Sequence, residues 1–237
     1  CLFMVASPIG NLGDVTVRAL HALTVADTVA CEDTRHSQAM LRAYGLEKPA
    51  SAWLAVHEHN EQQAAQEVIV RLQAGQRVAY LCDAGTPGLS DPGTRLVAAV
   101  HASGLRVSPL PGASSATALL SVSGDLIRGD WVFVGFLPAR GQAREQALGA
   151  LSRDARAHLL LESPHRIQAL AASLNALGER TLTVGRELTK QFEEVHTLPA
   201  SQLTQWLEAN AHRTKGEFVV MVHAMAPVAN DESQALA

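Results

Sequence analysis

The sequence predicts an α/β protein built from two α/β lobes with a ligand cleft between them. Five short apolar runs in the first half of the chain are each followed by a helical pattern, which is typical of a doubly wound parallel sheet. Apolar runs and helical patterns continue after a polar stretch near Ser123, which we interpret as the seam between lobes. We therefore expect an N-terminal lobe at 1–122, a C-terminal lobe at 123–226 and a flexible tail at 227–237.

Composition limits the class of protein. Hydrophobic residues make up 47% of the 237 residues and aromatic ones only 4%, which indicates an aliphatic core. No apolar run is long enough to cross a membrane, and three widely spaced cysteines fit reduced thiols, so we expect a soluble, cytoplasmic protein. Cys1 cannot be a native start, and we expect a trimmed N-terminus. The net charge of -4 argues against a protein that coats nucleic acid by charge alone, but it leaves room for a local basic patch.

The elements of the first lobe follow from alternating apolar runs and amphipathic segments. The expected strands are Leu2–Ala6, Thr28–Cys31, Ala52–Val56, Arg77–Leu81 and Arg106–Pro109. The expected helices are 14–23 with Asp14 as its N-cap, one ending at Tyr44 before Gly45, 62–74, 94–103, and one ending near Val122.

The second lobe is predicted in the same way. The expected strands are Trp131–Phe136, Ala157–Leu161, Thr181–Val184, Glu194–Thr197 and Phe218–Val222. The expected helices are a solvated one on or near which Arg140, Arg144 and Arg153 lie, one from Ile167 to Leu177 before Gly178, and one from about Ser201 to Asn210.

The stretch Leu81–Gly93 is the first candidate for a functional loop. It leaves the carboxyl end of a predicted buried strand, which is the usual place for a ligand in an α/β sheet. Its three glycines allow the backbone to approach a ligand, and its two prolines stiffen it. Asp83 and Asp91 add carboxylates at either end. A rigid turn in which these aspartates cap backbone amides is the alternative.

Other predicted strands also end in dense polar clusters. If these strands lie in one sheet per lobe, their carboxyl ends bring the clusters to a common edge. The clusters are Ser7–Asp14, Glu32–His36, His57–Glu61, Glu162–Arg166 and Arg186–Lys190.

Several familiar kinds of site are absent from the sequence. It has neither Gly-x-Gly-x-x-Gly after the first strand nor a Gly-x-x-x-x-Gly-Lys-Ser/Thr loop, which disfavours nicotinamide and simple nucleotide chemistry. His57 and His59 could begin a metal site, but spacing fixes no third ligand, so we expect no metal. Ser114 and Ser115 lack the Gly-x-Ser-x-Gly elbow of a hydrolase.

Together, the loops resemble a known family. The motifs are Ser-Pro-Ile-Gly-Asn-Leu-Gly-Asp from Ser7, Cys-Glu-Asp-Thr-Arg-His from Cys31, His-Glu-His-Asn-Glu from His57, Asp-Ala-Gly-Thr-Pro with Ser-Asp-Pro-Gly from Asp83, Pro-Leu-Pro-Gly from Pro109, Gly-Phe-Leu-Pro from Gly135, Glu-Ser-Pro-His-Arg from Glu162, Arg-Glu-Leu-Thr-Lys from Arg186 and Lys-Gly-Glu from Lys215. The set resembles the ribosomal RNA small subunit methyltransferase I family of the tetrapyrrole-methylase superfamily, over about residues 2–224. It departs from the family pattern at Ser7, where threonine is common, and at Gly88-Leu89, where a bulkier apolar pair is common.

The resemblance implies an S-adenosylmethionine-dependent 2'-O-methyltransferase of a cytidine in small-subunit (16S) ribosomal RNA. It also implies a bacterial cytoplasmic enzyme, a homodimer, and an assembled small subunit as the substrate. The acidic net charge likewise favours an assembled subunit over free RNA. By similarity, a folded cofactor would bind between the lobes. The implied cofactor-binding residues are Pro8, Asp83, Ala84, Gly85, Thr86, Pro87, Leu89, Ser114, Ser115, Ala116, Phe136, Leu137 and Gly216. A plain helix cap is the alternative for Ser114 and Ser115.

A ribose hydroxyl is a poor nucleophile, so a base or a charged neighbour must ease loss of its proton. Lys190 is the favoured base, because a lysine with a lowered pKa can accept a proton. The other predicted catalytic residues are Glu32, Asp33 and Arg35, with His57 and Glu187 as further candidates for the base. The predicted substrate-binding residues are Arg18, His57, Arg166 and Arg186. Alternatively, Arg35 pairs with Glu32 or Asp33, and Arg186 with Glu187, as purely structural ion pairs.

Two other functions remain open at this point. A small-molecule, tetrapyrrole-type methyltransferase would share the cofactor loops but need an apolar acceptor pocket, and the clusters near Cys31 and His57 are too polar for one. A ribosome-assembly protein that binds RNA without catalysis would keep the fold alone. The sequence leaves undetermined the target nucleotide, the dimer interface and any partner enzyme that acts on the same nucleotide.

Overall fold

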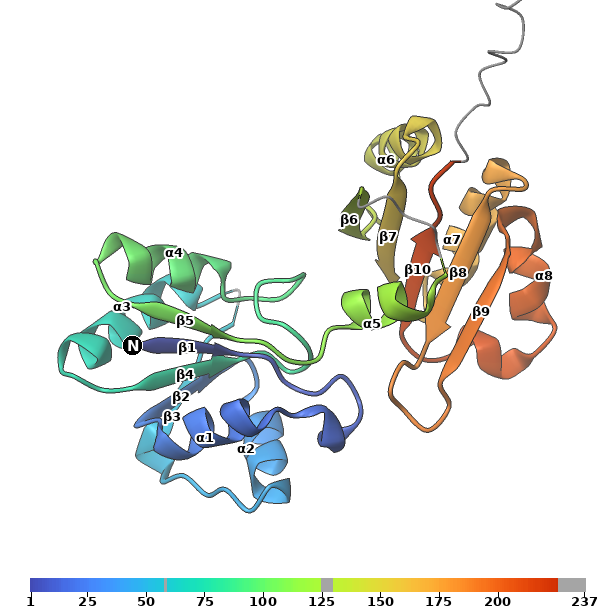
Figure 1. Ribbon diagram of the computed structural model, residues 1–237. Helices are drawn as coiled ribbons and strands as arrows, with labels where there is room; N and C mark the ends of the chain where they lie inside the picture. The colour runs from blue at the N-terminus through green and yellow to red at the C-terminus, as the bar shows by residue number, and fades with distance from the viewer. Residues whose placement is uncertain (58, 125–129, 226–237) are drawn as a thin grey trace, which may run out of the picture. The chain divides into compact units, whose positions relative to one another are not determined.

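The computed structural model describes residues 1–57, 59–124 and 130–225, which form two compact units (Figure 1). Unit 1 comprises Cys1–Ala118 together with Thr189–Gln191. Unit 2 comprises Leu119–Leu188 and the chain from Phe192 onward. The predicted boundary after residue 122 stays a prediction, and the predicted tail at 227–237 lies outside the described residues.

Unit 1 is built on the five-stranded parallel sheet that the sequence predicts. Its strands run in the order β3-β2-β4-β1-β5. Val5 at the end of β1 pairs with Leu81 in β4 and with Leu110 in β5, so these strands end level with one another. The loops that follow them therefore leave one edge of the sheet. The strands are β1 (Leu2–Val5), β2 (Thr28–Cys31), β3 (Trp53–Ala55), β4 (Val78–Leu81) and β5 (Val107–Leu110).

Helices cover both faces of this sheet (Figure 1). Successive side chains of a strand point to opposite faces, so Ala79 and Leu81 face one layer while Val78 and Tyr80 face the other. The layer on Ala79 and Leu81 contains α1 and α2, and the opposite layer contains α3 and α4. The helices of these two layers are α1 (Val17–Val25), α2 (Thr34–Ala43), α3 (Glu61–Gln73) and α4 (Thr94–Ala102). They are followed by α5 (Ser115–Val122).

The start of α1 differs from the expectation. The side chain of Thr16, not that of Asp14, caps α1 by accepting from the Ala19 N–H at 3.1 Å. Asp14 instead ends a short 3-10 helix, η1 (Leu12–Asp14), which begins where Asn11 accepts from the Gly13 N–H at 2.9 Å. The N-cap thus lies two residues later than predicted, after a turn in which the Asn11 side chain satisfies the Gly13 amide.

Unit 2 contains a mixed five-stranded sheet in the order β6-β7-β10-β8-β9. β10 is central and antiparallel to both neighbours, β6 is parallel to β7, and β8 and β9 form an antiparallel pair. The strands are β6 (Trp131–Phe136), β7 (Ala157–Glu162), β8 (Thr181–Arg186), β9 (Glu194–Pro199) and β10 (Phe218–Val222).

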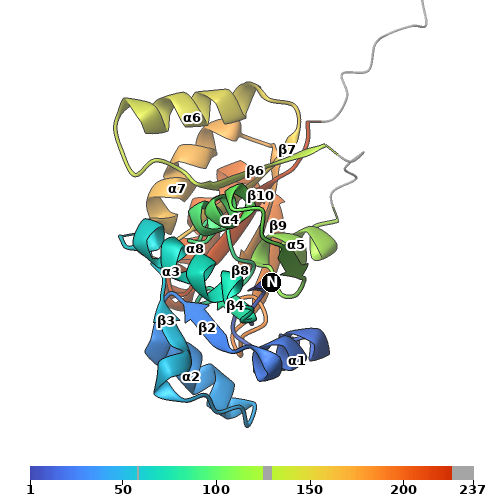
Figure 2. The ribbon, with the colours of Figure 1, turned by 90° about the vertical axis from the view of Figure 1, so that its left-hand side faces the viewer.

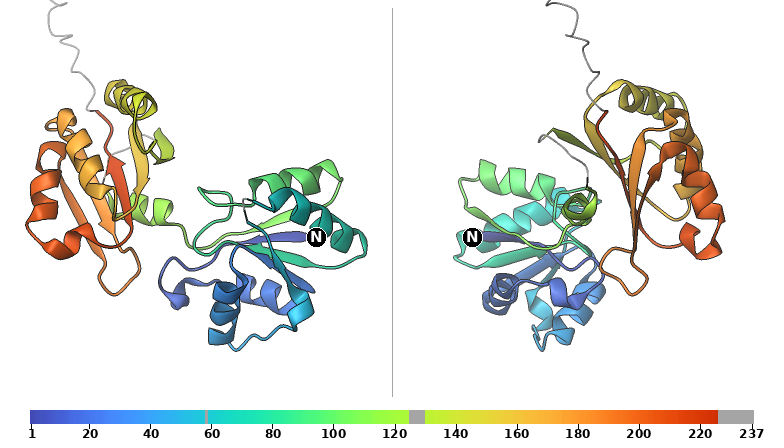
Figure 3. Two further views of the ribbon diagram at one scale, coloured as in Figure 1. Left: turned by 180° about the vertical axis from the view of Figure 1, so that it is seen from behind. Right: turned by 45° about the vertical axis from the view of Figure 1, so that its right-hand side comes forward.

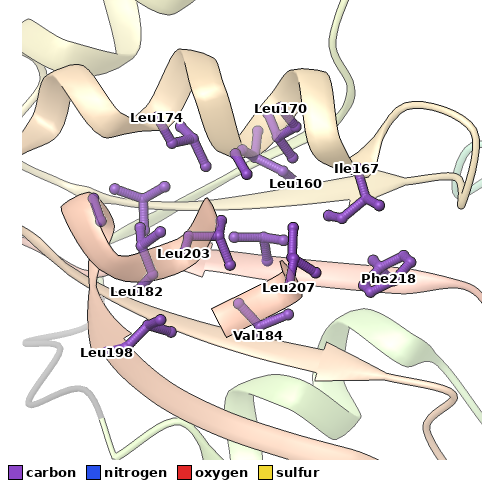
Figure 4. Close-up of a cluster of buried hydrophobic side chains, with 14 of the residues drawn as sticks. Leu160, Ile167, Leu170, Leu174, Leu182, Val184, Leu198, Leu203, Leu207 and Phe218 are labelled. Carbon is purple, nitrogen blue, oxygen red and sulfur yellow. The ribbon is translucent and has the colours of Figure 1, made fainter. Parts of the chain in front are cut away.

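The main core of unit 2 lies between this sheet and three helices (Figures 3 and 4). Leu160, Val184 and Phe218 from the strands meet Leu170 and Leu207 from the helices, and all five are buried. The helices and short 3-10 turns of this unit are α6 (Gln142–Arg153), α7 (Ile167–Leu174), η3 (Asn175–Leu177), η4 (Ala200–Gln202), α8 (Leu203–Glu208) and η5 (Ala211–Thr214).

Two predicted helices are shorter than expected. The helix predicted to reach Leu177 ends at Leu174 and tightens into η3, and the one predicted from Ser201 is the η4 turn followed by α8. In the described part of the chain, no helix has the length and hydropathy of a membrane span.

Candidate functional site

Three loops at the carboxyl edge of the unit 1 sheet are pinned to one another. Ser7 and Gly85 form an isolated antiparallel bridge, with backbone hydrogen bonds of 2.9 and 3.1 Å. The Ser7 hydroxyl also donates to the Cys82 carbonyl at 3.0 Å, and that of Thr86 donates to the Ala113 carbonyl at 3.2 Å. The loops after β1, β4 and β5 thus form one connected surface.

A pocket of about 400 Å³ opens on this surface and is lined only by residues of unit 1. Its volume is within the range of small-molecule sites. The lining residues come from the loop after β1, the start of α1, the loop after β5, the first turns of α5 and the segment near residue 189. They are Ile9, Asp14, Thr16, Gly112, Ala113, Ser114, Thr117, Ala118 and Thr189.

Ser114 gives this pocket an unused polar group. Its side chain is buried, and among the described residues its Oγ has no hydrogen-bond partner. It immediately precedes α5, whose first backbone N–H groups carry the positive end of the helix dipole. Gly112 on the same loop has no side chain. A Cβ at this position would lie only 3.0 Å from the Cβ of Ala6, so the loop packs closely there. A buried unpaired hydroxyl in a pocket of this size fits a polar ligand.

The loop between β8 and β9 has a strained backbone and contributes Thr189 to the pocket. Glu187 and Thr189 have φ angles of 50° and 67°, a conformation that costs free energy for residues other than glycine. Glu187 is held on both sides, because its N–H donates to the Glu217 carbonyl at 3.0 Å and its carboxylate accepts from the Glu217 N–H at 2.9 Å. Gly216 makes room for this carboxylate, since a Cβ there would lie 2.5 Å from Glu187 Cγ.

Lys190 follows Thr189 and belongs to unit 1. Its aliphatic stem lies directly over Gly10, where a Cβ would come within 2.3 Å of Lys190 Cγ. Gly10 adopts a φ of 150° and adjoins Ile9 of the pocket wall. The favoured base is therefore positioned beside the pocket by a glycine that leaves space for it.

The predicted catalytic residues after β2 have a partly structural role. Asp33 caps α2 by accepting from the N–H groups of Arg35 and His36, and it forms a 3.4 Å ion pair with Arg35. The Arg35 backbone N–H and guanidinium lower the pKa of Asp33, which makes it a weaker base. The Asp33 N–H in turn donates to the Asp83 carboxylate at 3.3 Å. Of the alternatives for Arg35, the structure shows the pairing with Asp33.

Asp91 is a carboxyl group of this region with a raised pKa. It is half-buried, and burial together with the nearby carboxylates of Glu32 and Asp83 raises its pKa to about 6. Asp91 therefore changes charge near neutral pH, inside the loop that the sequence singles out.

Glu61 anchors the far end of the same loop. This buried residue opens α3, and its Oε1 accepts from the N–H groups of Gly93, Arg95 and Leu96 at 3.0 to 3.1 Å. It thereby satisfies the first turn of α4 in place of a local cap. The loop after β3 is also held, because Asn60 accepts from the His57 N–H at 2.8 Å.

Five of the predicted site residues belong to unit 2, and none of them is among the residues that line this pocket: Phe136, Leu137, Arg166, Arg186 and Gly216. Phe136 is 51% exposed and Leu137 is buried at the end of β6. Arg166 donates to the Leu137 carbonyl and pairs with buried Glu162 at 3.3 Å, so its guanidinium braces this loop. Arg186 donates to the carbonyls of Lys215 and Phe192 at 2.7 and 3.0 Å.

The structure places the other predicted residues as follows. Ser114 lines the pocket, Pro8 precedes Ile9, and Ser115 and Ala116 open α5 beside it. The loop residues Ala84, Gly85, Thr86, Pro87 and Leu89 lie in the pinned surface but do not line the pocket. Arg18 lies exposed on α1, and His57 Nδ1 is buried without a partner among the described residues. No group of three or more His, Cys, Asp and Glu side chains within the described ranges is arranged to hold a metal ion.

Of the residues that line the pocket, only Ser114 was predicted from the sequence as a site residue. Gly112 lies inside the quoted Pro-Leu-Pro-Gly motif and Thr189 inside Arg-Glu-Leu-Thr-Lys, so both carried a signal. Thr16, Thr117 and Ala118 carried none, since ordinary helix residues become pocket walls only through packing.

Comparisons with known proteins agree with this fold. Residues 2–204 match the family model described as Tetrapyrrole (Corrin/Porphyrin) Methylases. Among solved structures, a diphthine synthase superposes with a TM-score of 0.69 at 17% identity, covering 94% of this chain and 89% of that one. Uroporphyrin-III-C-methyltransferase from Thermus thermophilus gives 0.64 at 19% identity, covering 94% and 93%. The fold is that of the tetrapyrrole methylases, and the chain belongs to this class.

Curated relatives identify the family within the class. The protein from Mesorhizobium japonicum named Ribosomal RNA small subunit methyltransferase I is 46% identical over 223 residues, which cover 93% of this chain and 74% of the relative. Proteins of the same name from Vibrio cholerae and Pseudomonas aeruginosa are 42% and 41% identical, covering 94% and 98% of this chain and 76% and 82% of theirs. The chain belongs to the ribosomal RNA small subunit methyltransferase I family.

Replacing Glu61 by alanine tests whether this carboxylate fixes the loop. Three N–H groups at the start of α4 lose their acceptor, so we expect a loss of about 2–3 kcal/mol in local stability. Hydrogen exchange of the Gly93, Arg95 and Leu96 amides should accelerate accordingly. Glu67→Ala is the matched control, because Glu67 pairs with Arg71 at the surface of the same helix and should cost well under about 1 kcal/mol. Equal exchange in both variants would refute this role of Glu61.

The raised pKa of Asp91 predicts a pH dependence of stability. Between about pH 4 and its folded pKa of about 6, the folded state keeps a proton that the unfolded state has lost, so stability falls as pH rises through this window. Asp91→Asn should therefore be more stable than the parent protein at pH 7.5 and no more stable at pH 3.5. Thermal unfolding at a series of pH values measures the difference, and a constant difference across the series would contradict the assignment.

Proposed function

We propose that this chain transfers a methyl group from S-adenosylmethionine to the ribose 2' oxygen of a cytidine in 16S ribosomal RNA. Membership of the ribosomal RNA small subunit methyltransferase I family supports the reaction and the class of substrate. The observation that carries the proposal in this molecule is the pocket beside Lys190, with the unpartnered Ser114 hydroxyl inside it.

The residues of the pocket fit such a cofactor. Its volume of about 400 Å³ suits a small molecule, and its wall combines the apolar side chains of Ile9 and Ala118 with hydroxyls. When bound, S-adenosylmethionine supplies an activated methyl group on a sulfonium ion, so the protein needs mainly to position the two reactants. Ser114 and the first amides of α5 would hold a polar end of the cofactor, and Asp14 would attract its positive charge. Loops cross-linked by the Ser7–Gly85 bridge provide the rigidity that positioning requires.

Lys190 is our proposed base for the ribose hydroxyl. The packing of its stem on Gly10, next to Ile9 of the pocket wall, supports this role. Asp33 is less suited, because the Arg35 N–H and guanidinium stabilise its charged form. Glu32 and Arg35 would then orient the substrate near the rim. We further propose that the protein works as a cytoplasmic homodimer on assembled small subunits.

The reaction can be tested with isotopically labelled S-adenosylmethionine and small ribosomal subunits that lack the modification. We expect label in the ribosomal RNA, in a dinucleotide that resists alkali because its 2' oxygen is blocked. Label on a base, or transfer to a tetrapyrrole acceptor in place of RNA, would contradict the proposed reaction. RNA binding without transfer would favour a non-catalytic assembly protein.

Lys190→Ala tests the base. Loss of a general base typically slows a reaction by about 10²- to 10⁴-fold, so we expect kcat to fall in that range while the Kd for S-adenosylmethionine is unchanged. Lys190→Arg is the matched control, because it keeps the positive charge but cannot release a proton near neutral pH. Full activity in Lys190→Arg would assign the residue a purely electrostatic role, and full activity in Lys190→Ala would remove it from the mechanism.

A further inference from the structure

The two helices on one face of the unit 1 sheet carry an unbalanced positive charge. α1 and α2 contain Arg18, Arg35 and Arg42, all exposed, and neither helix contains a carboxylate. Exposed His21 and His36 lie on the same helices. Figure 2 shows both helices, in blue, on the same side of the sheet. A chain whose net charge is -4 thus has one locally basic face.

The opposite face of the same sheet shows that this is not a general property of the unit. α3 and α4 contain Arg71 and Arg95, but also Glu61 and Glu67, so their charges balance. Arg71 is moreover paired with Glu67. The charge asymmetry between the two helical layers therefore distinguishes one face.

Carboxylates close to α1 and α2 in sequence are largely engaged. Asp33 caps α2 and pairs with Arg35 at 3.4 Å, and Asp27 pairs with Arg77 at 2.9 Å. Asp14 and Glu47, both exposed, flank the helices in sequence. Within the described residues, neither Arg18 nor Arg42 forms an ion pair. Their charges remain available to a partner.

This basic face reaches the pocket. The hydroxyl of Tyr44 donates to the Leu12 carbonyl at 2.7 Å, which holds the end of α2 against η1. η1 ends in Asp14, and Thr16 caps α1, and both residues line the pocket. Leu12 and Val17 on this rim are 47% and 84% exposed, so apolar surface lies among the cations. Arg42 lies two residues before Tyr44, and Arg18 lies two residues after Thr16.

We propose that the face formed by α1 and α2 is a docking surface for the phosphodiester backbone of ribosomal RNA, with Arg18 and Arg42 as its principal contacts. Unpaired guanidinium groups are well suited to phosphate, and such contacts position RNA without reading its sequence. RNA seated here would lead from the basic face to the pocket rim, where its ribose meets the transferred methyl group. The proposal rests on the RNA methyltransferase function proposed above.

The test uses the full chain with Arg18→Gln and Arg42→Gln combined. We expect KM for small subunits to rise roughly five- to tenfold near 100 mM salt, with kcat and the Kd for S-adenosylmethionine unchanged. Each lost phosphate contact should also reduce the slope of log affinity against log salt by about 0.7–0.9, so the double variant should lose about 1.5. Direct binding to small subunits, measured without the cofactor, gives the salt slope independently of catalysis.

Arg95→Gln with Arg106→Gln is the matched control. It removes the same charge from two exposed positions outside α1 and α2, one on α4 and one immediately before β5. An equal rise in KM in both double variants would overturn the proposal, since net charge alone would then account for it. An altered oligomeric state in the α1–α2 variant, measured by analytical ultracentrifugation, would also overturn it by making this face a protein interface. Failure of the parent protein to methylate subunits that it still binds would refute the function and leave the docking surface standing.

Discussion

The site depends on the antiparallel bridge between Ser7 and Gly85. Parallel strands deliver their loops to one sheet edge, but nothing in a parallel sheet obliges those loops to touch. Two backbone hydrogen bonds and the Ser7 hydroxyl on the Cys82 carbonyl join the first loop to the central one, and Thr86 joins the central loop to Ala113. The pocket wall therefore consists of segments that move together, which suits chemistry that depends on alignment.

Holding these loops in place requires conformations that the chain would not otherwise adopt. Ser90, Glu187 and Thr189 all have positive φ, although none is a glycine. Such strain persists only where surrounding contacts outweigh it, and those contacts are visible. Glu187 exchanges two hydrogen bonds with Glu217, and buried Glu61 gathers three amides at the end of the loop that contains Ser90. Backbone strain beside a pocket, stabilised by hydrogen bonds from surrounding residues, is typical of a functional site.

The sequence predicted the sheets well because buried strands and amphipathic helices leave periodic patterns. Polar clusters directly follow several of the predicted strands in the sequence, so the region of the candidate site could also be predicted. Helix starts were harder to predict: Thr16 caps α1, while Asn11 and Asp14, which have the same capping preference, belong to the preceding 3-10 turn. Thr189 lies in the Arg-Glu-Leu-Thr-Lys motif, but its place in the pocket wall depends on long-range packing, which local patterns do not record.

Charge distribution explains how an acidic protein can act on RNA. A uniformly basic surface would bind any nucleic acid and hold it away from the site as often as near it. Arg18 and Arg42 lie on two helices that contain no carboxylate, while Glu67 and Asp27 neutralise Arg71 and Arg77, so positive charge is concentrated on this face. That face ends at η1, where the Tyr44 hydroxyl ties the end of α2 to Leu12. If RNA docks on this face as proposed, weak and orientated attraction would favour a preformed subunit, whose fixed phosphates can meet both arginines at once, over a flexible strand that must be ordered first.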